Sequence, residues 1–172
     1  MSFRLAASLA PLLVAGCAAM HGGPRATAAL QPTYGNAAAG TVTFAQHGNK
    51  VLVSGEVRGL KPNGMHGFHV HEKGDCSGAD GMTTGGHFNP DAKPHGEHGS
   101  APHHAGDLVS LKADANGVAK FSYDSNAFTV GSGAANDVVG RGLVVHRDSD
   151  DYKTQPTGNS GARIACAVIA RS

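Results

Sequence analysis

Gly67-Phe68-His69-Val70-His71 is the stretch that decides how this chain folds, because apolar side chains alternate in it with imidazoles. Successive side chains of a β-strand point to opposite faces, so the two histidines share one face and the phenylalanine and valine share the other. The run Leu143-Val144-Val145-His146 ends with the same parity. At both places we expect the apolar side chains to face a core and the imidazoles to face outward. The pattern predicts a metal site on the outer wall of a β-sheet.

The composition is that of one β-rich domain with long turns. The chain has 172 residues, 25 of them Gly, and only 5% are aromatic, which fits a single all-β domain better than a helical one. The formal net charge is +1, so nothing in the charge balance suggests a nucleic-acid partner. No apolar run reaches about 18 residues, and no transmembrane helix is predicted.

Short apolar or β-branched runs alternate with turn signals along the chain. The predicted strands are 41–45, 51–57, 65–71, 108–111, 118–123, 142–146 and 164–169. Gly48-Asn49 predicts a hairpin between the first two, and Asn116-Gly117 predicts a hairpin between the fourth and fifth. Two long stretches, 72–106 and 147–161, lack strand character. Loops of this length in a compact domain are usually functional, and five of the 11 histidines lie in the first of them.

The first residues are predicted to be an export signal, in which Met1 and Arg4 precede a short apolar segment. The segment ends in Leu13-Val14-Ala15-Gly16-Cys17, which is similar to a bacterial lipoprotein cleavage box. Several acyl chains on Cys17 would anchor the protein, since one chain binds membranes only marginally. Ordinary cleavage after Ala19 is the alternative. The predicted segments are a signal peptide at 1–16, a lipid-anchored tether at 17–25 and a folded domain at 26–172.

Two cysteines remain once Cys17 is assigned to the leader. An even number of cysteines in an exported protein favours a disulfide between Cys76 and Cys166, and two buried free thiols are the alternative. Closing a loop of about 90 residues would stabilise the fold by about 4 to 5 kcal/mol in the chain-entropy model. The bond would also tie the loop after His71 to the strand that carries Arg163.

Five motifs occur in a fixed order along the chain: GFHVHEKGDC at 67–76, GGHFNP at 85–90, HAGDL at 104–108, GLVVHRDSDD at 142–151 and GARIACAVI at 161–169. In this order and spacing they resemble the copper/zinc superoxide dismutases, over residues 26–172. The early Cys17 and the short segment after Asp151 are most similar to the exported bacterial branch. The resemblance implies an eight-stranded Greek-key β-barrel with two long functional loops, and it places a further strand at 27–31.

The resemblance implies two metal ions with four protein ligands each, and it assigns His87 to both. A histidine that binds two metals through its two ring nitrogens must be an imidazolate, which two dications make feasible. In the family this bridge opens on the copper side upon reduction, so His87 would then donate a proton to the peroxide product. The implied copper ligands are His69, His71, His87 and His146, and the implied zinc ligands are His87, His95, His104 and Asp107. The spacing to Asp107 favours His104 over the adjacent His103.

Other residues match supporting roles in the family. Asp150 is expected to link His69 and His95 and so to orient both imidazoles. Arg163 is expected to attract and hydrogen-bond the superoxide anion, with a structural salt bridge as the alternative role. Lys73 and Lys153 are candidates for steering the substrate. His66 is expected to be a structural hydrogen-bonding residue, while His98 and His103 have no matching role and are expected to be exposed.

The resemblance therefore implies an enzyme that converts superoxide to dioxygen and hydrogen peroxide and protects the cell envelope, with copper and zinc as cofactors. We expect a periplasmic protein whose only contact with the membrane is the lipid anchor. The rival hypothesis is a non-enzymatic copper-binding module, to which the extra His98 and His103 lend slight support. A storage module has no need of a bridging histidine, a zinc carboxylate and an anion-binding arginine together. A homodimer is compatible with the resemblance, but no interface can be read from the sequence.

Overall fold

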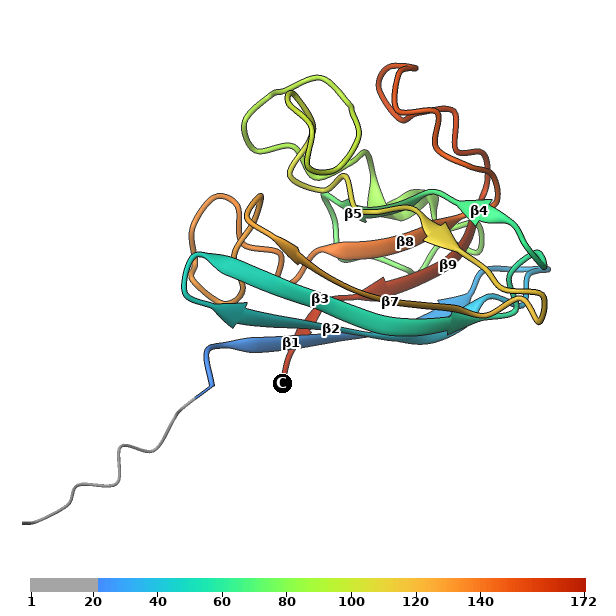
Figure 1. The fold of residues 1–172 in the computed structure, drawn as a ribbon, viewed down its shortest axis with the longest axis horizontal. Coiled ribbons are helices and arrows are strands. Elements are labelled where there is room, and N and C mark those ends of the chain that lie inside the picture. The colour runs from blue at the N-terminus through green and yellow to red at the C-terminus, as the bar shows by residue number, and fades with distance from the viewer. Residues whose placement is uncertain (1–21) are drawn as a thin grey trace, which may run out of the picture.

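The computed structural model describes residues 22–172, and within them the protein is built from antiparallel β-strands (Figure 1). The predicted signal peptide and Cys17 lie outside the described residues. None of the helical segments in the described part of the chain has the length and hydropathy of a membrane span. The strands are β1 (Arg25–Pro32), β2 (Ala39–His47), β3 (Lys50–Arg58), β4 (Met65–His66), β5 (Phe68–His71), β6 (Leu111–Lys112), β7 (Ala119–Ser125), β8 (Gly142–His146), β9 (Arg163–Val168) and β10 (Ala170–Arg171), with one 3-10 turn η1 (Met82–Thr84).

Eight of these strands form one curled sheet. Seven of them follow the order β5-β8-β9-β1-β2-β3-β7, and β10 pairs with β1. The chain therefore crosses from β3, which lies next to one end of the sheet, to β5 at the other end, as in a Greek key. Strands β4 and β6 form a separate pair, and they precede β5 and β7, the two end strands of the large sheet. The all-β expectation is confirmed, with the barrel realised as a curled half-barrel and this small pair.

The first predicted hairpin is confirmed. Strands β2 and β3 pair along their whole length, from Ala39↔Arg58 to His47↔Lys50. Gly48 adopts a φ of 58° in the turn, a conformation that glycine reaches without steric cost. Alternate residues of both strands, Phe44 and Val53 among them, are fully buried in the core between the two sides of the curled sheet.

The second predicted hairpin is wrong. The Asn116-Gly117 turn exists, with the Asp114 carboxylate accepting hydrogen bonds from the main-chain N–H groups of Asn116 and Val118. The strands on either side of the turn nevertheless separate, because β6 pairs with β4 and β7 pairs with β3. Strand β6 is also shorter than predicted. A local turn reverses the chain, but the partner of each strand is decided by the sheet it completes.

The predicted single strand at 65–71 is broken at Gly67. A Cβ atom at this position would lie 2.6 Å from the Ser160 hydroxyl oxygen, so glycine lets the loop of Ser160 pack directly on the main chain. The break sends β4 to β6 and β5 to β8. The chain is thus redirected at the point where the metal-ligand candidates begin.

The N-terminal boundary of the domain lies slightly earlier than predicted. Strand β1 begins at Arg25, and the carbonyl of Pro24 accepts a hydrogen bond from the Gln46 N–H at 2.9 Å. These two residues, assigned to the tether by the sequence, are part of the folded domain. The two long loops, 72–106 and 147–161, stand together over the side of the sheet that carries β5 and β8 (Figure 1).

Candidate metal centre

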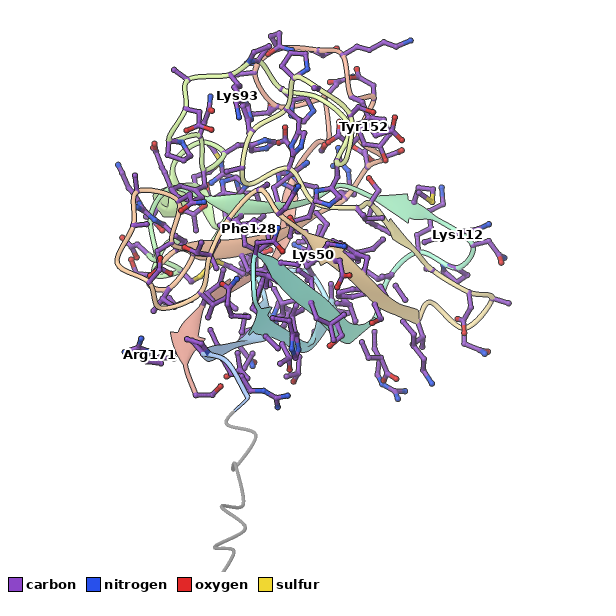
Figure 2. All side chains as sticks on the ribbon, turned by 60° about the vertical axis from the view of Figure 1, so that its left-hand side comes forward. Lys50, Lys93, Lys112, Phe128, Tyr152 and Arg171 are labelled. Atoms are coloured by element: carbon purple, nitrogen blue, oxygen red, sulfur yellow. A yellow bond between two sulfur atoms is a disulfide. The ribbon has the colours of Figure 1, made fainter. Side chains whose placement is uncertain are left out.

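The candidate ligands converge under the two long loops. Strands β5 and β8 are antiparallel neighbours, with His69 opposite Val144 and His71 opposite Gly142. The imidazoles point away from the core as the alternation predicts, yet His69, His71 and His146 are buried because the loops cover that face. Figure 2 shows the loop side chains gathered above the sheet, around the labelled Lys93 and Tyr152.

Two groups of buried side chains have ligand atoms within 4.8 Å of one another. One consists of His69, His71, His87 and His146, which we call the four-histidine cluster. The other consists of His87, His95, His104 and Asp107, which we call the carboxylate cluster. They are the two sets that the resemblance implied, and His87 belongs to both.

Hydrogen bonds determine which ring nitrogens face the centre of the four-histidine cluster. Nδ1 of His71 lies 2.9 Å from the Gly85 carbonyl oxygen, and Nδ1 of His146 lies 3.2 Å from that of Gly161. A carbonyl can only accept, so each Nδ1 must donate and each Nε2 keeps a lone pair. These two Nε2 atoms lie 3.3 Å apart. Burial lowers the pKa of both rings well below the usual range, so protonation does not relieve the contact at neutral pH.

The carboxylate cluster is arranged around one oxygen. Oδ1 of Asp107 lies 2.9 Å from Nδ1 of His87, 3.0 Å from Nδ1 of His95 and 3.3 Å from Nδ1 of His104. A tetrahedron with metal–ligand bonds of about 2.0 Å has edges of about 3.3 Å, so these spacings suit a zinc ion. Oδ2 accepts the main-chain N–H groups of Gly96 and His104, which hold the carboxylate in place. Burial would raise the pKa of Asp107, but hydrogen bonds from the histidines outweigh it and hold that pKa well below its usual range.

His87 joins the two clusters. Its ring stacks on that of His69 with centroids 3.9 Å apart, and its Nε2 is buried without a hydrogen-bond partner among the described residues. Nδ1 of His69 is likewise buried and unpartnered. Burial lowers the pKa of His87 to about 4, so the ring is uncharged at neutral pH in the metal-free protein. Unpartnered buried nitrogens are costly, and metal ions at these positions would satisfy them.

Asp150 accepts a hydrogen bond from one histidine of each cluster. Its Oδ2 accepts a hydrogen bond from Nε2 of His69 at 2.7 Å, and its Oδ1 accepts one from Nε2 of His95 at 2.9 Å. These are the two histidines that the sequence assigned to it. Burial lowers the pKa of His95, but hydrogen bonds to Asp107 and Asp150 outweigh it and raise that pKa to about 9.

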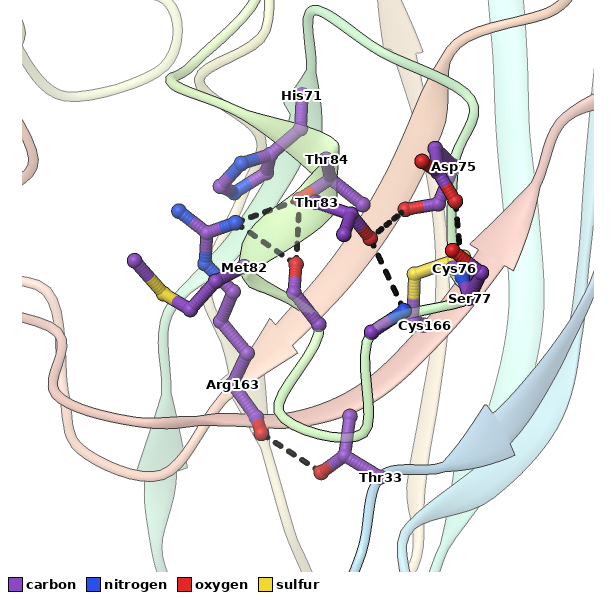
Figure 3. The surroundings of a disulfide bond; sticks show 12 residues. Thr33, His71, Asp75, Cys76, Ser77, Met82, Thr83, Thr84, Arg163 and Cys166 are labelled. Atoms are coloured by element: carbon purple, nitrogen blue, oxygen red, sulfur yellow. Dashed lines mark hydrogen bonds between the residues drawn. A yellow bond between two sulfur atoms is a disulfide. The ribbon is translucent and has the colours of Figure 1, made fainter.

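Arg163 lies beside the four-histidine cluster and is held by the loop that follows Cys76 (Figure 3). Its guanidinium donates to the Gly81 carbonyl at 2.8 Å, the Thr84 hydroxyl at 2.6 Å and the Gly85 carbonyl at 2.7 Å. Gly85 also accepts from His71, so one carbonyl joins the arginine to a copper-ligand candidate. No carboxylate lies within ion-pair distance of Arg163 in the described part of the chain, which disfavours the salt-bridge alternative.

The disulfide between Cys76 and Cys166 is present, with the two Cα atoms 5.9 Å apart. It joins the loop to β9, three residues from Arg163. The loop is also closed on itself, since the Thr83 hydroxyl donates to the Asp75 carbonyl at 2.6 Å (Figure 3). The bond therefore fixes the segment whose oxygens hold the guanidinium.

For the remaining histidines, the expected role of His66 is confirmed and the expected exposure of His98 and His103 is corrected. Nδ1 of the buried His66 lies 2.9 Å from the His146 carbonyl, as expected of a structural residue. His98 and His103 are half-buried, so the expectation that they are exposed is wrong. Both turn inward because each Nδ1 finds a main-chain carbonyl, that of Asp107 for His98 and that of His104 for His103. Lys73 and Lys153 are exposed.

Three residues of the site escaped the sequence analysis. Thr84 supplies an oxygen to Arg163, and Gln155 exchanges hydrogen bonds with both the N–H and the carbonyl of His95. Gly158 has a φ of 65°, and a Cβ atom there would lie 2.5 Å from Nε2 of His95 and would collide with the Asp150 carboxylate. Nothing in a single sequence marks such contacts, apart from the presence of Gly158 in a long loop.

Comparison with known proteins decides the family. A family model described as copper/zinc superoxide dismutase matches residues 38–169. The chain belongs to the copper/zinc superoxide dismutase family. Members of this family convert superoxide to dioxygen and hydrogen peroxide, so the protein is an oxidoreductase with copper and zinc as cofactors. The rival hypothesis of a non-enzymatic copper-binding module is not supported.

Individual relatives agree with this assignment. A superoxide dismutase [Cu-Zn] of Paramecium bursaria Chlorella virus 1 is 45% identical over 137 residues, covering 76% of this chain and 71% of the relative. An extracellular superoxide dismutase [Cu-Zn] of Brugia pahangi is 40% identical over 143 residues, covering 77% and 69%. A crystal structure of the clock protein EA4 superimposes with a TM-score of 0.77 at 38% identity, covering 85% of this chain and 93% of that chain.

Breaking the Cys76–Cys166 bond is expected to harm the metal site as well as the fold. A Cys76→Ser/Cys166→Ser double variant should lose about 4 kcal/mol of unfolding free energy in the chain-entropy model. It should also lose copper and activity under conditions in which circular dichroism still reports a folded β-sheet, because the loop that holds Arg163 is released. Thiol counting on the active wild-type protein provides the control. Two free thiols in fully metallated, active enzyme would contradict the structural role.

Proposed function

We propose that this protein is an exported superoxide dismutase of the bacterial cell envelope, in which the four-histidine cluster binds copper and the carboxylate cluster binds zinc. The observation that carries the ligand assignment is the membership of His87 in both clusters. One ring nitrogen, Nδ1, lies 2.9 Å from the Asp107 carboxylate, and the other, Nε2, is buried without a hydrogen-bond partner among the described residues. No other side chain is shared by the two groups in residues 22–172.

Copper, when bound, supplies the one-electron redox chemistry of dismutation, and zinc supplies a second positive charge on the shared imidazole. The protein side chains attract the substrate, donate a proton and orient the metal ligands. Arg163 presents a fixed positive charge beside the four-histidine cluster, which attracts the superoxide anion and can hydrogen-bond it. His87 is the proton donor to the peroxide product. Asp150 orients His69 and His95 so that their Nδ1 atoms face the metal positions.

Reconstitution of the metal-free protein tests the ligand assignment. Activity in a superoxide-decay assay should require copper, and one equivalent each of copper and zinc should give the full rate. Zinc alone should restore stability to heat without activity. Full activity with copper excluded, or uptake of a single metal equivalent at saturation, would contradict the two-site assignment.

The envelope location rests on the leader and on the disulfide. Residues 1–16 are predicted to be a signal peptide, Cys17 the lipidated first residue of the mature chain and the residues before Pro24 its tether. A structural disulfide is typical of an oxidising compartment, and a relative is named an extracellular enzyme.

Changing Cys17 to Ser separates the two proposed modes of processing. If Cys17 is lipidated, the wild-type protein should partition with the membrane fraction and Cys17→Ser should be soluble in the periplasm with normal activity. Intact-mass analysis of the mature chain shows directly where the leader is cleaved and whether Cys17 is acylated. A wild-type mass that matches cleavage after Ala19 without acylation would contradict the lipid anchor.

A further inference from the structure

A histidine outside both clusters is turned toward the metal centre. The loop between His95 and His104 is exposed from Glu97 to Pro102 except at His98, which is half-buried. A turn closed by the Ser100 N–H on the Glu97 carbonyl at 3.0 Å brings the loop back over β7. The side chain of His98 is thereby directed under the loop, away from solvent.

His98 supplies a hydrogen bond to the main chain of Asp107. Its Nδ1 lies 2.9 Å from the Asp107 carbonyl oxygen, and because a carbonyl can only accept, Nδ1 must carry the proton. Asp107 is buried, and no main-chain N–H of the described residues donates to this carbonyl. The imidazole is therefore the hydrogen-bond partner that keeps this buried acceptor satisfied.

The ring also rests on the sheet. It packs edge-on to Tyr123 of β7, with centroids 5.3 Å apart and an interplanar angle of 62°. The Tyr123 hydroxyl is buried without a hydrogen-bond partner among the described residues, so the tyrosine serves as an aromatic platform.

We propose that His98 is a positioning residue that holds the main chain of Asp107 against strand β7 and thereby fixes the carboxylate cluster. The inference rests on the proposed function, since it takes Asp107 as the zinc carboxylate. Gly96 and His104 hold the Asp107 side chain by its Oδ2 atom, and His98 holds its backbone. Because both the side chain and the main chain of Asp107 are held, its Oδ1 atom stays close to the Nδ1 atoms of all three histidines of the carboxylate cluster. His98 touches neither metal position and acts only through Asp107.

Matched variants isolate the hydrogen bond. Leucine and asparagine have nearly the same size, but the asparagine side-chain N–H₂ can occupy the place of Nδ1 and donate to the same carbonyl. We therefore expect His98→Leu to release zinc to a chromogenic chelator about tenfold or more faster than wild type, as is usual when a partner behind a metal ligand is lost. His98→Asn should return the rate to within about threefold of wild type, since the lost bond is restored. His47→Leu is the control, because His47 lies exposed at the end of β2 and belongs to neither cluster.

Cobalt provides a second measurement that does not depend on enzyme activity. Cobalt in the zinc position should give tetrahedral visible bands in wild type, His98→Asn and His47→Leu, and altered bands in His98→Leu. If circular dichroism shows that metal-free His98→Leu is unfolded, His98→Phe replaces it in the same comparison, because phenylalanine keeps a ring against Tyr123. Two results would overturn the positioning role alone. One is that His98→Leu, or His98→Phe in its place, releases zinc at the wild-type rate. The other is that His98→Asn releases zinc as fast as His98→Leu. A wild-type protein that takes up no cobalt would overturn the proposed ligand set, and the inference with it.

Discussion

His87→Ala is expected to abolish the coupling between the two metals and to remove most of the dismutase activity. The variant loses one ligand from each cluster, and it leaves the Asp107 carboxylate without one of its three histidine contacts. Zinc affinity should fall by about a hundredfold or more, because a ligand contributes more than the supporting partners whose loss costs about ten- to a hundredfold. Copper should remain bound by the three other histidines, and its EPR spectrum should change because the fourth nitrogen is absent.

The measurement is zinc and copper content together with the copper EPR spectrum. His47→Ala is a suitable control, because His47 lies exposed at the end of β2, in the turn opposite Lys50. An unchanged spectrum with full zinc occupancy in His87→Ala would show that His87 does not bridge the metals.

Arg163→Glu is expected to cause the second-largest loss of activity while copper stays bound. A unit charge a few ångströms from the anion contributes about 1 to 3 kcal/mol at effective dielectric constants between those of water and a protein surface. Removing that attraction in Arg163→Ala should lower the rate on the order of tenfold, and reversing the charge should lower it further. The rate of the wild-type enzyme should also fall as salt rises, since the Debye length is about 10 Å at 0.1 M ionic strength.

Two further substitutions separate the charge of Arg163 from its contacts. Arg163→Lys keeps the positive charge but cannot reach Gly81, Thr84 and Gly85 with a planar fork, whereas Arg163→Gln keeps a donor without charge. If attraction of the anion dominates, the lysine variant should be the more active of the two. Full activity of Arg163→Glu with copper in place would refute the guiding role, and a glutamine variant better than lysine would assign Arg163 to holding the loop.

Several features were accessible from the sequence because they depend on local chemistry. The alternation around His69 and His71 fixes which side chains share a face of a strand, wherever that strand is placed in the sheet. Gly48-Asn49 closes a hairpin between two strands that are adjacent in the chain, so turn and pairing coincide. The five ordered motifs indicated the family, and the long segments 72–106 and 147–161 were recognisable as loops because they lack any strand pattern.

Other features depend on residues that meet only in the folded chain. The Asn116-Gly117 turn could not reveal that β6 and β7 take different partners, because strand pairing depends on the whole sheet. The burial of the outward-facing histidines follows from the loops that close over them. The inward turn of His98 follows from a carbonyl nine residues away and a tyrosine on β7. The order of residues alone was enough to show which side chains share a face of a strand and to which family the chain belongs. The ring nitrogen that faces the four-histidine cluster was settled in the folded protein for His69, His71 and His146, because each of these tautomers is set by an oxygen at least 14 residues away in the chain.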